Sequence, residues 1–227
     1  MHRRILLFFP LTLLALACTP HARAQLTDPS LAHELEAPDR DQWQLPHAIV
    51  QALEIQPGQR VVDLGAGTGY MLPFLNEAVG PTGKVYAVEV QKDFISALKL
   101  RVHHEQLAQV EVLEDTQTAL PLPEKVDRVL LLDTYRELEE PIAMLRAVRQ
   151  SLKPGGLVVI VDARPDPGVE GPPPDQRLSA HTVEDEARGA GLTVVAESEH
   201  LPRQFLLVLA ETGDAARMAA GVTPTAP

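Results

Sequence analysis

The stretch RVVDLGAGTGY, residues 60–70, joins a short apolar run to a turn that contains three glycines. The run Arg60–Leu64 is typical of a buried strand. Gly65, Gly67 and Gly69 predict a tight turn, because glycine adopts backbone conformations and close approaches that other residues resist. We therefore expect a ligand to contact the main chain of this turn.

Strand-like and helix-like segments alternate along most of the chain. The predicted strands are Arg60–Leu64, Lys84–Val88, Val110–Leu113, Val126–Leu132, Gly156–Asp162, Leu192–Glu197 and Phe205–Leu209. The predicted helices are Pro46–Leu53, Gly69–Val79, Lys92–Gln106, Leu138–Ser151 and Thr182–Ala190. This alternation predicts an α/β fold with a Rossmann-like, doubly wound sheet of seven mostly parallel strands. The connection before the last strand is too short for a parallel crossover, so we expect that strand to be antiparallel.

The N-terminus has the pattern of a signal peptide. Basic residues at positions 2–4 precede the apolar run Ile5–Ala17, which falls short of the roughly 20 residues that span a bilayer. We expect cleavage after Ala24 and export to the periplasm or cell envelope, with a lipoprotein through Cys18 as a minor alternative. Cys18 is the only cysteine and would be removed with the leader, so we expect no disulfide and no cysteine metal site in the mature chain, and we assign no metal ligand elsewhere.

Four regions follow from these patterns: a signal peptide (1–24), an N-terminal segment without clear periodicity (25–43), one α/β domain (44–211) and a disordered tail (212–227). A hydrophobic content of 45% allows a sizeable core in the α/β domain. The formal net charge of −11 disfavours nucleic acid as a partner. We expect no transmembrane segment in the mature chain.

The glycine turn departs from two common nucleotide-binding motifs. Tyr70 stands where the dinucleotide fingerprint has its third glycine, and the lysine of a phosphate-binding P-loop is missing. Asp63 would repel a phosphate and attract a cation such as an ammonium or a sulfonium. These features disfavour a nicotinamide-dependent oxidoreductase.

Residues 61–70, VVDLGAGTGY, resemble the first motif of the class I S-adenosylmethionine-dependent methyltransferases. Asp127–Asp133 resembles the fourth motif of that family, and residues 152–156 resemble the turn into its fifth strand. The resemblance runs from about Gln44 to Leu209. It implies S-adenosylmethionine as the cofactor and methyl transfer as the activity.

The resemblance also implies which residues hold the cofactor. Asp63 is expected to contact its amino-acid part, and Glu89 to bind both ribose hydroxyls. Asp115 follows the third predicted strand, where this family often places an acid near the adenine amino group. The full expected set is Asp63, Gly65, Ala66, Gly67, Gly69, Tyr70, Glu89, Val90, Asp115, Thr116 and Asp133.

Asp133 and Tyr135 are the expected catalytic residues, because they follow the fourth predicted strand at the edge where the methyl group should point. Asp133 would orient or deprotonate the acceptor, unless it only caps the next helix. Tyr135 would stack on the acceptor or form a hydrogen bond with it. His181 is a further candidate base.

The proline-rich stretch Asp166–Arg177 is expected at the same edge, where a stiff loop would shape the acceptor pocket. Arg177 would pair with an anionic acceptor, and Trp43 lies either over the cofactor or in the core. We expect a small-molecule acceptor. Two alternatives stay open: a protein carboxyl methyltransferase of the isoaspartyl type, which has a strand start similar to residues 83–86, and a non-catalytic S-adenosylmethionine-binding protein.

Overall fold

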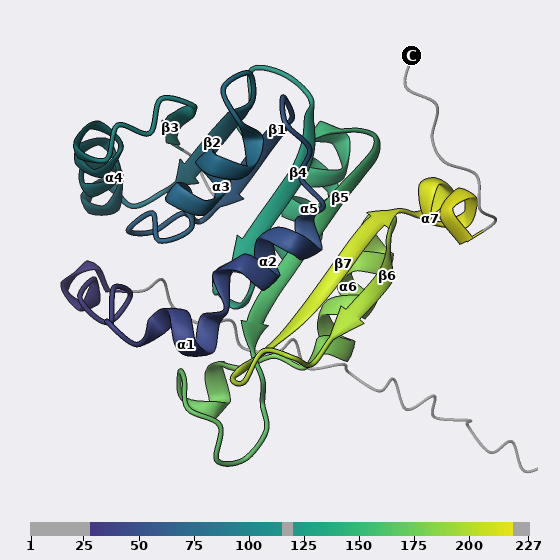
Figure 1. Ribbon diagram of the computed structural model, residues 1–227. Coiled ribbons are helices and arrows are strands. Elements are labelled where there is room, and N and C mark those ends of the chain that lie inside the picture. Colours follow the sequence, from purple (N-terminus) through teal and green to yellow (C-terminus); the bar gives the residue numbers. More distant parts are fainter. Residues whose placement is uncertain (1–27, 115–119, 220–227) are drawn as a thin grey trace, which may run out of the picture.

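The structure is a computed structural model that describes residues 28–114 and 120–219. Its strands are β1 (Arg60–Leu64), β2 (Lys84–Glu89), β3 (Val110–Glu114), β4 (Val126–Leu132), β5 (Leu152–Ala163), β6 (Leu192–Ser198) and β7 (Gln204–Glu211). They form one sheet in the order β3-β2-β1-β4-β5-β7-β6 (Figure 1). β7 pairs antiparallel with both β5 and β6, and all other pairs are parallel, so the predicted Rossmann-like fold is confirmed.

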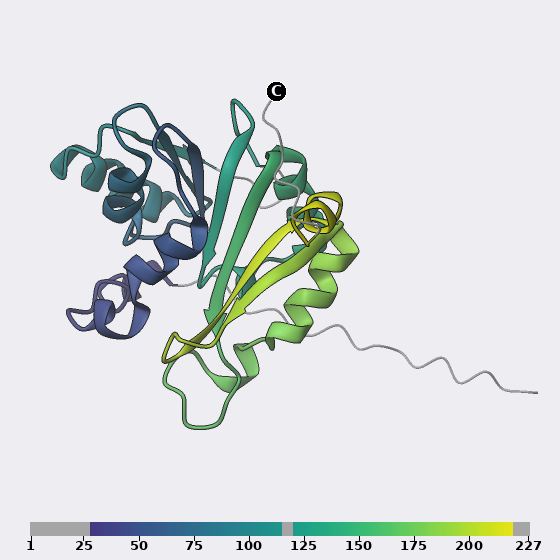
Figure 2. The same ribbon diagram turned by 45° about the vertical axis from the view of Figure 1, so that its right-hand side comes forward.

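Helices cover both faces of the sheet (Figures 1 and 2). Helices α2 (Pro46–Leu53), α3 (Leu72–Val79) and α4 (Lys92–His104) contribute to the hydrophobic core on one face. Helices α5 (Pro141–Ser151) and α6 (Ala180–Ala190) contribute to the core on the other face. Neighbouring residues of β1 serve different cores: Val61 belongs to the first, Val62 to the second, and both are fully buried. Burial on both faces explains the continuous apolar runs of the sequence.

Two terminal regions contain helices that the sequence pattern did not predict. The N-terminal segment folds into the short 3-10 helix η1 (Pro29–Leu31) and helix α1 (Arg40–Gln44). The region predicted to be a disordered tail begins with helix α7 (Thr212–Ala219), so that prediction was wrong for these residues. Asp214 holds α7 in place, since its carboxylate accepts a hydrogen bond from the Gly155 amide at 2.8 Å. Residues 1–27 and 220–227, which include the expected signal peptide, lie outside the described residues.

Two predicted helices begin later than expected. Gly69 has a φ of +85°, so the turn continues to the start of α3 at Leu72. Before α5, the chain forms the 3-10 helix η2 (Tyr135–Glu137), and α5 begins at Pro141. Proline is well suited to a first helical turn, because it has no amide hydrogen that needs a partner.

From β1 the chain adds strands toward one edge of the sheet (β2, β3) and then returns to add β4 on the other side of β1. In such sheets a ligand binds between the carboxyl ends of the two strands where this reversal occurs, here β1 and β4. The glycine turn follows β1, and Asp133 follows β4. Both features therefore lie at the same edge of the sheet. Among the residues that the structure describes, no helix has the length and apolarity needed to cross a membrane.

Candidate functional site

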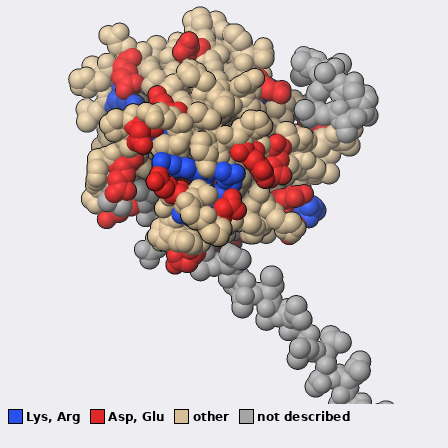
Figure 3. Space-filling model, turned by 60° about the horizontal axis from the view of Figure 1, so that its bottom comes forward, with Lys and Arg blue, Asp and Glu red and all other residues tan. Residues whose placement is uncertain are grey.

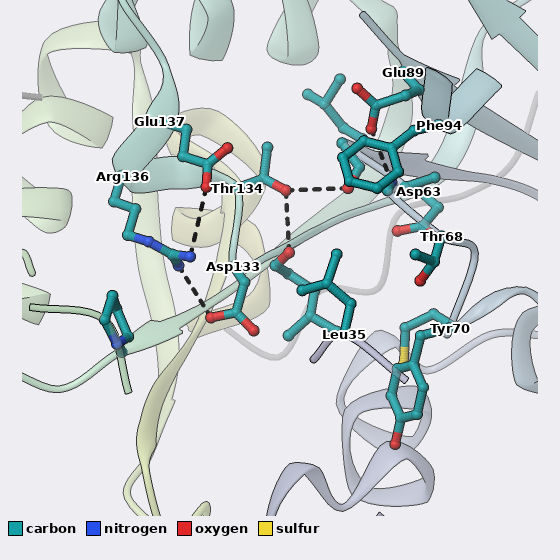
Figure 4. Close-up of a pocket in the computed structure, with 18 of the residues that line it drawn as sticks. Leu35, Asp63, Thr68, Tyr70, Glu89, Phe94, Asp133, Thr134, Arg136 and Glu137 are labelled. Atoms are coloured by element: carbon teal, nitrogen blue, oxygen red, sulfur yellow. Dashed lines mark hydrogen bonds and ion pairs between the residues drawn. The ribbon is translucent and has the colours of Figure 1, made fainter. Parts of the chain in front are cut away.

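A cavity of about 590 Å³ opens at the carboxyl ends of the parallel strands. Figure 4 shows Asp63, Tyr70 and Glu89 on one side of it and Asp133 and Arg136 on the other. All predicted cofactor-binding residues that the structure describes line this cavity, except Gly69. Asp115 and Thr116 lie outside the described residues. One cavity thus joins the predicted cofactor site to the predicted acceptor side.

The glycine turn needs glycine for both conformation and space. Gly65, Gly67 and Gly69 have φ values of +77°, +53° and +85°. A Cβ on Gly65 would lie 2.3 Å from the side chain of Thr134, and one on Gly69 would lie 2.8 Å from Leu72. The missing side chains therefore let Thr134, after β4, and Leu72, at the start of α3, pack closely against the turn.

Glu89 joins the end of β2 to the glycine turn. Its Oε2 accepts a hydrogen bond from the Gly67 amide at 2.8 Å. Its Oε1 accepts from the amides of Val90 and Gln91 at 2.8 and 3.0 Å. The side chain is buried but lines the cavity. A carboxylate fixed in this way keeps lone pairs for a ligand that carries hydroxyl donors.

Asp63 places a second carboxylate at this end of the cavity, with an exposed fraction of 3%. Burial, and then repulsion from the Glu89 carboxylate, raise the pKa of Asp63 to about 7, although Arg40 opposes the shift. A positively charged ligand group would compensate these two acids. The site therefore has the charge expected for a cationic nucleoside.

Helix α1 supplies a guanidinium that the sequence analysis missed. Arg40 is buried, and its guanidinium carbon lies 3.9 Å from the centroid of the Tyr70 ring. It donates hydrogen bonds to the Leu35 carbonyl and to the Gln44 side chain. The Tyr70 hydroxyl donates to Asp41 at 2.6 Å, which ties the glycine turn to the same segment. The sequence of this segment shows no helical periodicity. Its short helix is held by these contacts with distant residues, which a local pattern does not reveal.

Asp133 is held at the acceptor side by residues from three other elements. Its Oδ1 accepts hydrogen bonds from Gln204 at 2.9 Å and from Arg136 at 3.1 Å. Its Oδ2 lies 3.8 Å from Nη2 of Arg40, beyond hydrogen-bonding distance. The buried amide of Gln44 donates to Gln204 and thereby links α1 to this group. Oδ2 is thus the oxygen that remains for a ligand.

The capping alternative for Asp133 was wrong, because the residue before α5 is Glu140 and the residue before η2 is Thr134. Beneath Asp133, Arg136 forms a buried ion pair with Asp162 at 2.8 Å. Burial lowers the pKa of Arg136, but the surrounding carboxylates outweigh burial and raise it. This pair fixes the floor of the acceptor side.

The roles predicted for Tyr135, Arg177 and His181 were wrong, and the open position of Trp43 is now settled. Tyr135 is fully buried, its hydroxyl donates to Glu186 at 2.7 Å, and it does not line the cavity. Arg177 donates to the Pro172 carbonyl at 2.6 Å, so it stabilises the proline loop and does not face a ligand. His181 is 79% exposed on α6 and lies outside the cavity lining. Trp43 does line the cavity.

Comparisons with known proteins agree with this geometry. The family model described as a methyltransferase domain matches residues 61–156. Demethylmenaquinone methyltransferases from Geobacillus sp. (strain WCH70) and Oceanobacillus iheyensis are 28% and 31% identical over 114 residues, which cover 50% of this chain and 49% and 48% of theirs. The chain thus spans about half the length of the curated relatives it matches.

A solved structure gives the more complete match. It is a SAM-dependent methyltransferase from Aquifex aeolicus, with 31% identity and a TM-score of 0.78. The match covers 81% of this chain and 98% of that one. From the matched domain, the shared fold and the glycine turn with its two acids, we conclude that the chain belongs to the class I S-adenosylmethionine-dependent methyltransferases.

Proposed function

We propose that this protein transfers a methyl group from S-adenosylmethionine to a small organic acceptor. The observation that carries the proposal is the single cavity that joins Glu89 and Asp63 to Asp133. When bound, S-adenosylmethionine supplies a methyl group on a positively charged sulfonium. The two acids at the cofactor end fit this cation and its ribose hydroxyls, because both line the cavity as carboxylates fixed by burial or by backbone amides.

The acceptor side contributes mainly orientation. Gln204 and Arg136 fix Oδ1 of Asp133, so Oδ2 is positioned to accept a hydrogen bond from an O–H or N–H group of the acceptor. Asp133 would also take the proton that such an acceptor loses. Holding two reactants in one geometry supplies much of the rate enhancement of a displacement reaction.

A small acceptor is favoured over a protein because several segments crowd the cavity. Leu35 and Trp43 line it from the N-terminal segment, and Pro172 and Pro173 line it from the proline loop. The curated relatives, demethylmenaquinone methyltransferases, are named for a small molecule. The isoaspartyl-type and non-catalytic alternatives are outcomes of the following experiment.

The experiment incubates the full chain with methyl-labelled S-adenosylmethionine and a fractionated cell extract. We expect label in the small-molecule fraction, reduced several-fold by Asp133→Asn while affinity for S-adenosylhomocysteine is retained. Label in the protein fraction would favour the carboxyl methyltransferase. Cofactor binding without labelled product in any fraction would favour the non-catalytic protein.

Asp63 makes cofactor binding depend on pH. Because its pKa is raised to about 7 in the ligand-free protein, it is neutral at lower pH and attracts a cation only as pH rises. We expect S-adenosylhomocysteine to bind about tenfold more tightly near pH 8 than near pH 6, and its binding near pH 6 to release a proton from Asp63. Titration calorimetry at both pH values measures this ratio. If Asp63→Asn and the unchanged protein show the same ratio of affinities between pH 8 and pH 6, the pH dependence does not come from Asp63.

The same carboxyl group affects folding with the opposite sign. Its pKa in the unfolded chain is the ordinary 3.8, whereas in the folded chain it is about 7. The folded state therefore holds the proton more tightly between these values. The free energy of unfolding contributed by Asp63 falls as pH rises through this window and is constant above it.

The variant Tyr135→Phe distinguishes a structural role of Tyr135 in the core from the catalytic role that the sequence predicted. Losing the hydrogen bond to Glu186 should lower the free energy of unfolding by about 1–3 kcal/mol. Affinity for S-adenosylhomocysteine and methyl transfer should stay within about twofold, because the hydroxyl does not reach the cavity. Urea unfolding and calorimetry measure the two effects. Loss of methyl transfer at unchanged stability would restore Tyr135 as a catalytic residue.

We further propose that the protein is exported, on the basis of the N-terminal sequence pattern alone. N-terminal sequencing of the protein from its own cells tests this. A start at Gln25 supports cleavage after Ala24, and a start at Cys18 supports a lipoprotein. An intact Met1 in the cytosolic fraction would overturn export.

A further inference from the structure

Three segments that are distant in sequence meet at the rim of the acceptor side. Trp43 comes from α1, Glu170 from the proline loop, and Arg203 from the turn before β7; all three line the cavity. The guanidinium carbon of Arg203 lies 4.6 Å from the centroid of the Trp43 ring, and the guanidinium also pairs with the Glu170 carboxylate. The rim thus presents an aromatic side chain with a cation over it.

Arg203 differs from the other two arginines of the cavity. Arg136 is engaged by the buried Asp162, and Arg40 is buried with hydrogen bonds to Leu35 and Gln44. Arg203 instead pairs with Glu170, whose side chain is 73% exposed. Exposed ion pairs contribute little free energy, so a ligand anion can replace the Glu170 carboxylate at low cost.

Acidic side chains dominate this face of the molecule, so few positions on it can bind an anion. Figure 3 shows a short band of basic side chains with acidic side chains around it, on the face where the parallel strands end. Asp63, Glu89, Asp133, Glu137 and Glu170 are among the acids that line the cavity. An anionic group of a ligand is therefore stabilised where a guanidinium is available, and Arg203 is the most available of the three.

The wall beside this guanidinium is apolar and rigid. Pro172 and Pro173 line the cavity, and their rings fix the backbone. Arg177, which is itself buried, donates to the carbonyls of Pro172 and Arg164 at 2.6 and 3.0 Å and so anchors both ends of the loop. With Trp43, these prolines form flat apolar surface that an aromatic ring can contact.

We propose that the methyl acceptor is a flat aromatic compound with an anionic substituent bound by Arg203 and a hydroxyl group directed to Asp133. Gln204, the neighbour of Arg203, donates to Asp133, so the two ends of the acceptor site are joined through adjacent residues. The inference rests on the proposed methyl transfer and adds the chemical class of its acceptor.

The test uses the full chain saturated with S-adenosylhomocysteine and titrated with 4-hydroxybenzoate. Phenol lacks the anion, and 4-hydroxycyclohexanecarboxylate lacks the aromatic ring. Calorimetry gives the affinities, and Trp43 fluorescence reports the location, because Trp43 is the only tryptophan of the chain. We expect 4-hydroxybenzoate to bind about tenfold more tightly than either comparison compound and to change the fluorescence.

The two members of the ion pair should respond in opposite directions. Arg203→Gln should weaken 4-hydroxybenzoate binding about tenfold, while Glu170→Gln should strengthen it several-fold by removing the competing carboxylate. Arg188→Gln is the matched control, since Arg188 pairs with the carboxylates of Glu184 and Asp185 on the exposed face of α6, outside the cavity lining. Affinity for S-adenosylhomocysteine should stay the same in all three.

Three outcomes decide the matter. Opposite shifts in the two rim variants support the acceptor class. Equal affinity for the three compounds, no binding of any, or parallel shifts in the two variants would overturn it while the cofactor site stands. Failure of the unchanged protein to bind S-adenosylhomocysteine would overturn both this inference and the proposed function.

Discussion

Replacing Glu89 with alanine weakens S-adenosylhomocysteine binding by about 100-fold, a loss of about 2.7 kcal/mol. The carboxylate accepts three backbone hydrogen bonds, from the amides of Gly67, Val90 and Gln91. Each amide that loses its partner in a buried place costs about 1–3 kcal/mol. The variant therefore loses the conformation of the glycine turn together with the proposed acceptor for the ribose hydroxyls.

Titration calorimetry on the full chain measures this effect. Glu111→Ala is the matched control, because Glu111 lies on the surface of β3 and pairs with Lys84 at 2.8 Å. Glu89→Gln tests the charge separately, since the amide keeps the length of the side chain. An affinity of Glu89→Ala within about threefold of the unchanged protein would show that Glu89 does not hold the cofactor.

Arg136→Met is expected to have the largest effect on stability, a loss of about 3–5 kcal/mol in the free energy of unfolding. Asp162 is 1% exposed, and Arg136 donates to its carboxylate from both the backbone amide and the guanidinium. Removing the guanidinium leaves a buried carboxyl group that must bind a proton or remain charged without a partner.

Urea unfolding followed by circular dichroism measures this loss. Arg146→Met is the matched control, because Arg146 makes an exposed hydrogen bond to the Gly189 carbonyl. The double variant Arg136→Met/Asp162→Leu should recover much of the stability, since it removes both charges of the pair. A single variant as stable as the control would show that the pair does not support the acceptor side.

Most of the fold could be predicted from local sequence patterns. β1 and β4 match their predicted bounds, because strands buried on both faces carry continuous apolar runs. Helix α2 also matches, since Pro46 marks its first turn. Helices α1 and α7 were missed. Their order comes from contacts with distant residues, such as Asp214 with Gly155, and no short-range pattern records such contacts.

The two ends of the site differ in how far the sequence predicted them. The cofactor end lies on consecutive strand ends, and the resemblance to the methyltransferase family implied the roles of Asp63 and Glu89. The acceptor end is assembled across the fold: Gln204 contacts Asp133 from β7, and Arg40 approaches it from α1. Tyr135 follows β4 just as Asp133 does, yet η2 turns its ring into the core. Sequence position alone does not distinguish these directions.

The most direct test of the central claim is titration of the full chain with S-adenosylhomocysteine and, separately, with NAD. The geometry of the glycine turn, Asp63 and Glu89 predicts saturable binding of S-adenosylhomocysteine and no saturable binding of NAD. Saturable binding of NAD without binding of S-adenosylhomocysteine would contradict the assignment of this cavity to a methyltransferase.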